Sequence, residues 1–121
     1  MAKPRILIAD DEEGIRGSLT LILGEDYELV FAENGTEALA KLRSEPFALA
    51  FLDLKMPKLD GMEVLKALNG EQVRVPIIML TAYQSVELAQ DAVKLGARDY
   101  LPKPFERDQI LKAVQSVLQE T

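Results

Sequence analysis

The chain contains no cysteine and no histidine. Without cysteine it can form neither a disulfide nor a thiolate metal site, and without histidine it lacks the usual general base and the usual phosphodonor side chain. Any chemistry that the chain performs must therefore rest on carboxylates, lysine or hydroxyl groups.

Basic residues are outnumbered, with 14 Lys and Arg against 20 Asp and Glu, which gives a formal net charge of -6. This balance opposes the broad attraction to phosphate backbones that nucleic-acid binders need, so we expect no direct nucleic-acid contact by this domain. Residues 1–5 lack the regions of a signal peptide, and no apolar run approaches the length of a membrane span. We expect a cytoplasmic protein without membrane contact.

The composition is typical of one globular domain. Of the 121 residues, 48% are hydrophobic and 28% are charged. We find no repeat, low-complexity tract or Pro/Gly/Ser linker, so we expect a single domain over residues 1–121 that folds alone. The chain ends just after the last predicted helix, and a free-standing domain and one cut away from an output domain both remain open.

Five short apolar runs have the length of strands, and several are apolar on successive residues, as strands covered on both faces are. They span residues 6–9, 29–32, 48–52, 75–80 and 100–101. After each run, apolar residues recur at helical spacing, within 15–22, 38–42, 62–68, 86–93 and 110–117. This alternation predicts an α/β fold of five βα units: a doubly wound, five-stranded parallel sheet with helices on both faces.

Local signals support three helix ends. Asn34 precedes Glu37 at the spacing of a capping box, and Ser85 can cap the fourth helix. Gly96 follows that helix as a C-terminal stop.

Polar side chains directly follow the predicted strands, where the loops of such folds hold their sites. Asp10 and Asp11 follow the first strand, Asp53 ends the third, Thr81 follows the fourth and Lys103 follows the fifth. Three carboxylates brought together would repel one another unless they took up protons or bound a cation, and an all-oxygen set suits Mg²⁺ or Mn²⁺. Lys103 and Thr81 can contact phosphoryl oxygens, so the set outlines a phosphoryl-aspartate site.

In this order and spacing, four segments resemble the receiver domains of two-component response regulators, including the chemotaxis regulators. They are residues 6–12, 52–61, 80–82 and 100–105. The resemblance covers essentially the whole chain and implies a flavodoxin-like sheet order, 2-1-3-4-5.

The resemblance assigns roles to the residues at the strand ends. It implies that Asp53 is the phosphoacceptor, a carboxylate nucleophile that takes the phosphoryl group from a sensor histidine kinase or a small acyl phosphate. Asp11 would bind the metal directly, Asp10 mainly through water, and the backbone carbonyl of Lys55 would add a ligand beside Asp53. Lys103 would contact the phosphoryl group, and the bond between Lys103 and Pro104 would be cis.

The resemblance also implies how the signal leaves the site. Thr81 would move toward the phosphoryl group, and Tyr100 would follow into the vacated space. The partner-reading face would combine the helix over 86–93, the strand 100–101 and the helix over 110–117. Its partner would be an output domain, often transcriptional, or an effector protein, and phosphorylation could drive a homodimer through this face. Such a domain is not an enzyme in the ordinary sense, because it catalyses only its own phosphorylation and dephosphorylation.

Two side chains are expected to tune the lifetime of the phosphoryl group. Lys55 stands two residues after the phosphoacceptor and Tyr83 two residues after Thr81. A long cation and a bulky ring there would crowd the hydrolytic water, so a long-lived phosphoryl state is expected. Glu12 is interpreted as charge in the first turn of a helix and not as a ligand.

Other classes of protein explain the residues less well. A degenerate receiver that acts as a phosphorylation-independent docking module is the main alternative. A haloacid-dehalogenase-type phosphatase would carry its nucleophile and a second Asp two residues on after the first strand, whereas Asp10 is followed by Asp11 and Glu12. A Rossmann-like nucleotide-binding domain would need a Gly-rich loop at that position, which the sequence lacks.

Overall fold

A five-stranded parallel sheet forms the centre of the computed structural model, which describes residues 3–71, 73–82 and 85–119. The strands are β1 (Arg5–Ala9), β2 (Glu28–Ala32), β3 (Leu49–Asp53), β4 (Ile77–Thr81) and β5 (Asp99–Pro102). They are arranged in the order β2-β1-β3-β4-β5, and every neighbouring pair is parallel. The predicted fold class and strand order are therefore confirmed.

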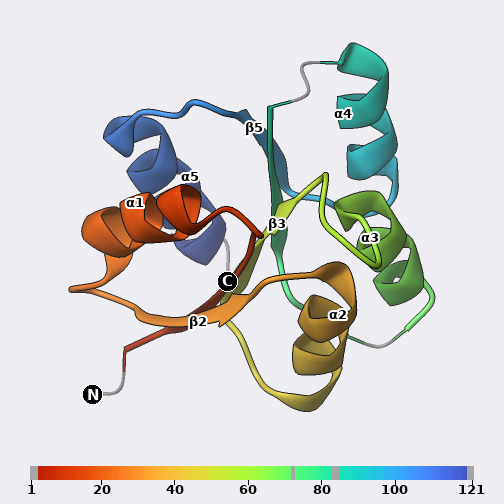
Figure 1. The fold of residues 1–121 in the computed structure, drawn as a ribbon, viewed down its shortest axis with the longest axis horizontal. Coiled ribbons are helices and arrows are strands. Elements are labelled where there is room, and N and C mark those ends of the chain that lie inside the picture. The colour runs from red at the N-terminus through yellow and green to blue at the C-terminus, as the bar shows by residue number, and fades with distance from the viewer. Residues whose placement is uncertain (1–2, 72, 83–84, 120–121) are drawn as a thin grey trace.

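Five helices follow the five strands in alternation. They are α1 (Glu13–Leu23), α2 (Gly35–Ser44), α3 (Gly61–Asn69), α4 (Val86–Lys94) and α5 (Arg107–Gln119). In Figure 1, α1 and α5 lie on one side of the sheet, and α2, α3 and α4 lie on the other. The sheet is thus the middle layer of three, as the alternating pattern predicts. Among the described residues, no helix is both long enough and apolar enough to span a membrane.

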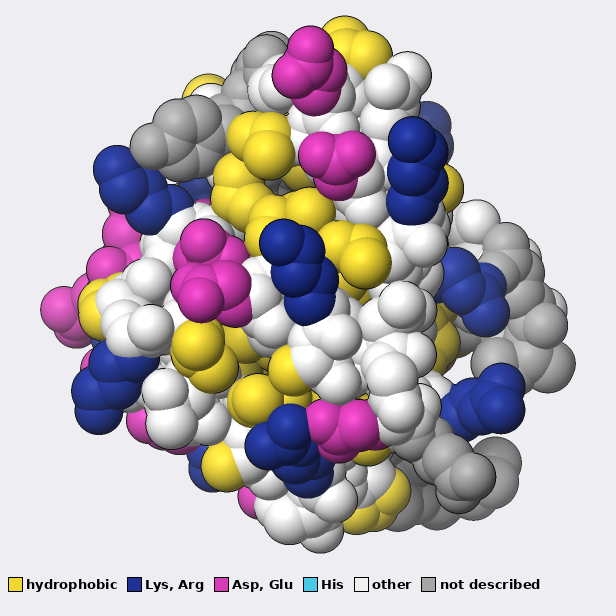
Figure 2. Space-filling view, turned by 90° about the vertical axis from the view of Figure 1, so that its right-hand side faces the viewer, with side chains coloured by type: hydrophobic (Ala, Val, Ile, Leu, Met, Phe, Trp, Pro, Cys, Tyr) yellow, Lys and Arg dark blue, Asp and Glu magenta, His cyan; other side chains and the backbone are white. Residues whose placement is uncertain are grey.

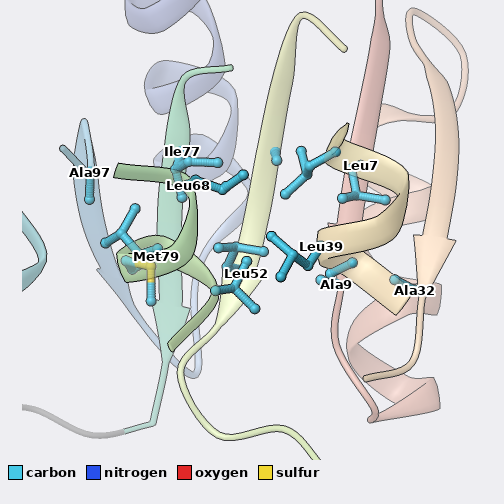
Figure 3. Close-up of a cluster of buried hydrophobic side chains, with 14 of the residues drawn as sticks. Leu7, Ala9, Ala32, Leu39, Leu52, Leu68, Ile77, Met79 and Ala97 are labelled. Carbon is cyan, nitrogen blue, oxygen red and sulfur yellow. The ribbon is translucent and has the colours of Figure 1, made fainter. Parts of the chain in front are cut away.

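Each face of the sheet has its own hydrophobic core, because successive strand residues point to opposite faces. In β1, Leu7 and Ala9 pack into the core beneath α2, α3 and α4. Ile6 and Ile8 pack into the core beneath α1 and α5. Figure 3 shows the first of these cores, with side chains of several strands meeting those of the covering helices. Burial on both faces explains the uninterrupted apolar runs: all five residues of β3 and of β4 are buried.

The predicted helix caps are present. The side chain of Asn34 accepts a hydrogen bond of 2.8 Å from the backbone N–H of Glu37, and Ser85 accepts one of 3.2 Å from Leu88. Gly96 has a φ of 105°, a left-handed conformation that glycine adopts without strain, just beyond the end of α4. A full capping box is also present between Asp60 and Glu63 at the start of α3, and it was not predicted from the sequence.

The apolar stripe that identified α4 faces outward. Val86 and Val93 are 74% and 57% exposed, respectively, whereas Ala92 is fully buried. Leu88 and Leu95 also pack against the core beneath α2, α3 and α4. The predicted helix is therefore present, and these two valines face the solvent rather than the core.

Candidate functional site

The carboxyl ends of β1, β3, β4 and β5 bring the predicted polar residues into one place. Asp10 and Asp11 follow β1, while Asp53 and Thr81 are the last residues of β3 and β4. Lys103 follows β5, and its backbone N–H donates to the Thr81 carbonyl over 2.8 Å, which extends the sheet pairing to this residue. Asp10, Asp53 and Thr81 are at most 4% exposed and Lys103 is 9% exposed, so these four polar groups are buried, whereas Asp11 is exposed.

The ammonium group of Lys103 lies at the centre of these residues. Its Nζ is 2.7 Å from Asp10 Oδ2, 3.0 Å from Glu12 Oε1 and 3.1 Å from Asp53 Oδ2. Burial by itself lowers the pKa of Lys103, but the three carboxylates outweigh it and hold the pKa above the usual range for lysine. Lys103 is therefore charged at any physiological pH and partly neutralises the acidic cluster.

The buried environment of Asp53 disfavours the ionised form of its carboxylate. Burial, together with the nearby charge of Asp10, raises the pKa of Asp53 to about 6, although Lys103 acts in the opposite direction. The backbone N–H of Lys55 donates a hydrogen bond of 3.2 Å to Asp53 Oδ1, which favours the ionised form. A buried carboxylate with a pKa near neutrality is typical of functional sites, where an ion or a substrate relieves the unfavourable burial.

The donor set fits a hard divalent cation. Asp10, Asp11 and Asp53 each offer a carboxylate oxygen within 4.8 Å of the others. Asp10 Oδ2 is buried and, within the described part of the chain, accepts no hydrogen bond of good geometry, although Lys103 Nζ lies 2.7 Å away. A buried carboxylate oxygen that has an ion pair but no well-directed hydrogen bond has capacity for a further cation, and an all-oxygen set suits Mg²⁺ or Mn²⁺.

A pocket of about 530 Å³ opens over this cluster. Its lining includes Asp11, Asp53, Lys55, Thr81 and Lys103. A phosphoryl group in this pocket would thus meet a carboxylate, a hydroxyl and an ammonium group together.

Tyr100 does not belong to the lining of this pocket. It pairs with Met79 in the sheet, is partly buried and packs against the core beneath α2, α3 and α4. Burial raises the pKa of its hydroxyl. The predicted neighbour Tyr83 lies outside the described residues. The peptide bond between Lys103 and Pro104 is cis, as expected.

Glu12 has a larger part in the site than the sequence suggested. It is the N-cap residue of α1, yet its side chain hydrogen-bonds to Lys103 over 3.0 Å. Its backbone N–H donates to Asp10 Oδ1 over 2.9 Å, which helps to orient that carboxylate. The expectation that Glu12 is only helix-terminal charge was incomplete, because Lys103 is 91 residues away and no local pattern connects the two.

The structure thus belongs to the doubly wound α/β class, with an acidic cluster and a lysine at the carboxyl edge of its sheet, and comparison with known proteins specifies the family. The family model described as "Response regulator receiver domain" matches residues 6–115. The chain therefore belongs to the response regulator receiver domains.

Curated relatives support the same family. The chain is 39% identical over 118 residues to the protein named "Response regulator MprA" of Mycobacterium tuberculosis, covering 97% of this chain and 51% of that protein. It is 38% identical over 116 residues to "Regulatory protein AtoC" of Escherichia coli, covering 95% of this chain and 25% of that protein. The chain thus spans about half, or less, of the length of these relatives.

Solved structures share the fold over nearly the whole chain. The CheY-like receiver domain protein from Methanospirillum hungatei superposes with a TM-score of 0.91 at 35% identity, covering 98% of this chain and 96% of that one. The chemotaxis protein CheY4 of Vibrio cholerae gives a TM-score of 0.88 at 36% identity, covering 97% of this chain and 100% of that one.

Proposed function

We propose that this domain accepts a phosphoryl group on Asp53 from a sensor histidine kinase and transmits the event as a change of shape. The observation that carries the proposal is the buried Asp53 carboxylate, which lies 3.1 Å from the Lys103 ammonium and lines the same pocket as Lys103 and Thr81. In the transfer, an oxygen of Asp53 attacks phosphorus while the bond to the donor's leaving group breaks. Lys103 stays protonated and compensates charge on the phosphoryl oxygens.

The metal in this proposal is Mg²⁺ or Mn²⁺. Asp10, Asp11, Asp53 and the backbone carbonyl of Lys55 would hold it. When bound, the cation would neutralise charge on the carboxylates and on the incoming phosphoryl group. The residues of the chain then divide the remaining work: Asp53 supplies the nucleophile and Lys103 binds the transferred group.

Thr81 and Tyr100 are proposed as the switch. The buried Thr81 lines the pocket, whereas Tyr100 is partly buried on β5, the strand next to β4. A phosphoryl group held by Thr81 would draw the carboxyl end of β4 inward. The ring of Tyr100 would then take up a second arrangement, and two arrangements that differ by a few kcal/mol suffice for a population shift.

The face formed by α4, β5 and α5 is the proposed output surface. Val86 and Val93 are largely exposed there, and Ala89 lies between them on the same face of α4. An output domain or effector protein would bind this face, and phosphorylation-dependent homodimers would use it as well. We propose that residues 1–121 form one receiver domain and that its output is transcriptional, as the names of two longer relatives suggest for those proteins. Because the proposed partner is a sensor histidine kinase, we expect the protein to be located in the cytoplasm.

The decisive experiment is the intact mass after incubation with acetyl phosphate, with and without Mg²⁺. We expect one added phosphoryl group that requires both Mg²⁺ and Asp53. Asp53→Asn should prevent the addition, whereas Asp108→Asn should not, because Asp108 is an exposed acid in the first turn of α5.

Beryllofluoride provides a second test that does not depend on the use of a small donor. If the wild-type protein gains no phosphoryl group and beryllofluoride also leaves its NMR spectrum unchanged, the phosphoacceptor proposal is wrong. The chain would then be better described as a phosphorylation-independent docking module.

A further inference from the structure

A second hollow lies between α3 and α4, on the face of the molecule away from α1 and α5. This α3–α4 groove has a volume of about 710 Å³. Apolar side chains line it, with lysines beside them: Leu54, Met62, Leu88, Leu95, Lys66 and Lys94. Figure 2 looks onto this side of the molecule and shows hydrophobic side chains at the surface, with Lys or Arg side chains among them. The volume lies within the range of about 300–1,000 Å³ that is usual for sites of small organic ligands.

The balance of charge around the groove is slightly positive, whereas the chain as a whole is acidic. The chain carries a net charge of -6, yet three lysines and only two aspartates line the groove. One of the aspartates, Asp60, directs its carboxylate to the start of α3, where it accepts a 2.8 Å hydrogen bond from the backbone N–H of Glu63. Within the described residues, Lys66 and Lys94 are exposed and form no ion pair. The groove therefore combines an apolar floor with cations that an anion could pair with.

We propose that the α3–α4 groove binds a small organic anion that has an apolar body and a carboxylate. The apolar part would cover Leu54, Met62 and Leu88, and the carboxylate would pair with Lys66 and Lys94. A cationic ligand would meet the excess of lysine, and a fully polar ligand would leave the apolar floor without a partner. This part of the inference does not depend on phosphorylation.

The groove shares a wall with the phosphoacceptor pocket. Lys55 lines both hollows, and its backbone N–H donates to Asp53 Oδ1. A second connection is along the chain: Thr81, which lines the phosphoacceptor pocket, ends β4, and α4, which lines the groove, begins five residues later at Val86. A phosphoryl group on Asp53 adds negative charge beside Lys55, so phosphorylation should weaken the binding of an anion in the groove. This coupling rests on the proposed function, and by linkage the groove ligand must weaken phosphoryl-state formation by the same factor.

The probe for the test is 4-phenylbutyrate, titrated into the ¹⁵N-labelled protein and followed by NMR. We expect saturable shifts at the backbone amides of Met62, Leu88 and Leu95. The neutral analogue 4-phenyl-1-butanol should bind several-fold more weakly, because it has the same apolar body and lacks the carboxylate.

Charge variants separate the groove from the rest of the surface. Lys66→Gln together with Lys94→Gln should weaken 4-phenylbutyrate by about three- to tenfold, the range expected for two exposed ion pairs. The matched pair Lys3→Gln with Lys112→Gln removes the same charge elsewhere and should leave the affinity unchanged. Equal affinity in both double variants, or shifts that map outside the groove, would overturn the site.

Beryllofluoride tests the coupling and keeps the two proposals apart. In its presence, with Mg²⁺, the affinity for 4-phenylbutyrate should fall by at least about twofold. An unchanged affinity in a protein that has bound beryllofluoride would refute the coupling alone. Failure to bind beryllofluoride would count against the proposed function and leave the groove to be judged by the charge variants. If 4-phenylbutyrate causes no saturable shifts but an acidic amphipathic peptide shifts the same amide resonances, the occupant of the groove is a protein segment and the small-molecule proposal is wrong.

Discussion

The buried carboxylate of Asp53 should make the stability of the metal-free protein depend on pH in an unusual direction. Most acidic groups stabilise a folded protein more as the pH rises, because their pKa is lowered by folding. Burial instead raises the pKa of Asp53 from 3.8 to about 6. The native state therefore keeps a proton that the unfolded state releases, and replacing Asp53 with asparagine should abolish the effect.

The sign and size of the effect follow from linkage. Between pH 3.8 and about 6 the native state binds more protons than the unfolded state, so stability falls as the pH rises. The contribution is fully present below pH 3.8 and is lost as the pH passes through about 6. A shift of this size corresponds to about 3 kcal/mol, of which about 1.5 kcal/mol is lost between roughly pH 5 and 7.5.

The assay is urea unfolding of the wild type and Asp53→Asn in EDTA at several pH values. Titrating groups far from the site act on both proteins, so the difference in free energy of unfolding reports Asp53 together with its coupling to Asp10 and Lys103. The variant should gain about 1.5 kcal/mol relative to the wild type between roughly pH 5 and 7.5, which moves the difference in urea midpoint by roughly 1 M. Asp108→Asn, which changes an exposed acid, should show no such trend. A difference between wild type and Asp53→Asn that stays constant over this pH range would refute the reasoning.

Three further predictions concern the site and the helices. Lys103→Met leaves the buried carboxylates of Asp10 and Asp53 without their cation. It should lower the free energy of unfolding by about 3–5 kcal/mol in metal-free buffer at pH 7.5. Lys112→Met, at an exposed position, should change the free energy of unfolding little. Mg²⁺ should raise the thermal midpoint of the wild type at pH 7.5 by calorimetry, and an equal rise in Asp53→Asn would exclude Asp53 as a ligand. Gly17→Ala should stabilise the protein by about 0.5–1 kcal/mol in urea unfolding, because a Cβ at this position of α1 meets open space. Gly35→Ala should destabilise the protein, because a Cβ there would overlap the backbone carbonyl of Leu59. A gain in stability at both positions would contradict the packing at Gly35.

Much of the fold could be read from local pattern. Strands covered on both faces must be apolar on successive residues, so β3 and β4 are visible as short uninterrupted runs. Caps such as Ser85 at α4 act within one turn and can be recognised from neighbours in sequence. The convergence of Asp10, Asp53 and Lys103 was also predictable, because the carboxyl ends of parallel strands meet on one edge of the sheet.

Contacts between distant segments needed the tertiary structure. The bond between Glu12 and Lys103 joins residues 91 positions apart, and only the folded sheet brings them together. The outward direction of Val86 and Val93 could not be inferred, since helical spacing shows that an apolar stripe exists but not whether the stripe faces the core or the solvent.

The sequence by itself determined the alternation of strands and helices, the polar residues at the strand ends and the family, because these depend on periodicity and order along the chain. The tertiary structure alone decided how deeply Asp53 is buried, how Lys103 is shared among three carboxylates and where α3 and α4 leave a groove. Burial, pKa and cavity shape are sums over neighbours from many segments, and only packing in three dimensions sets those neighbours.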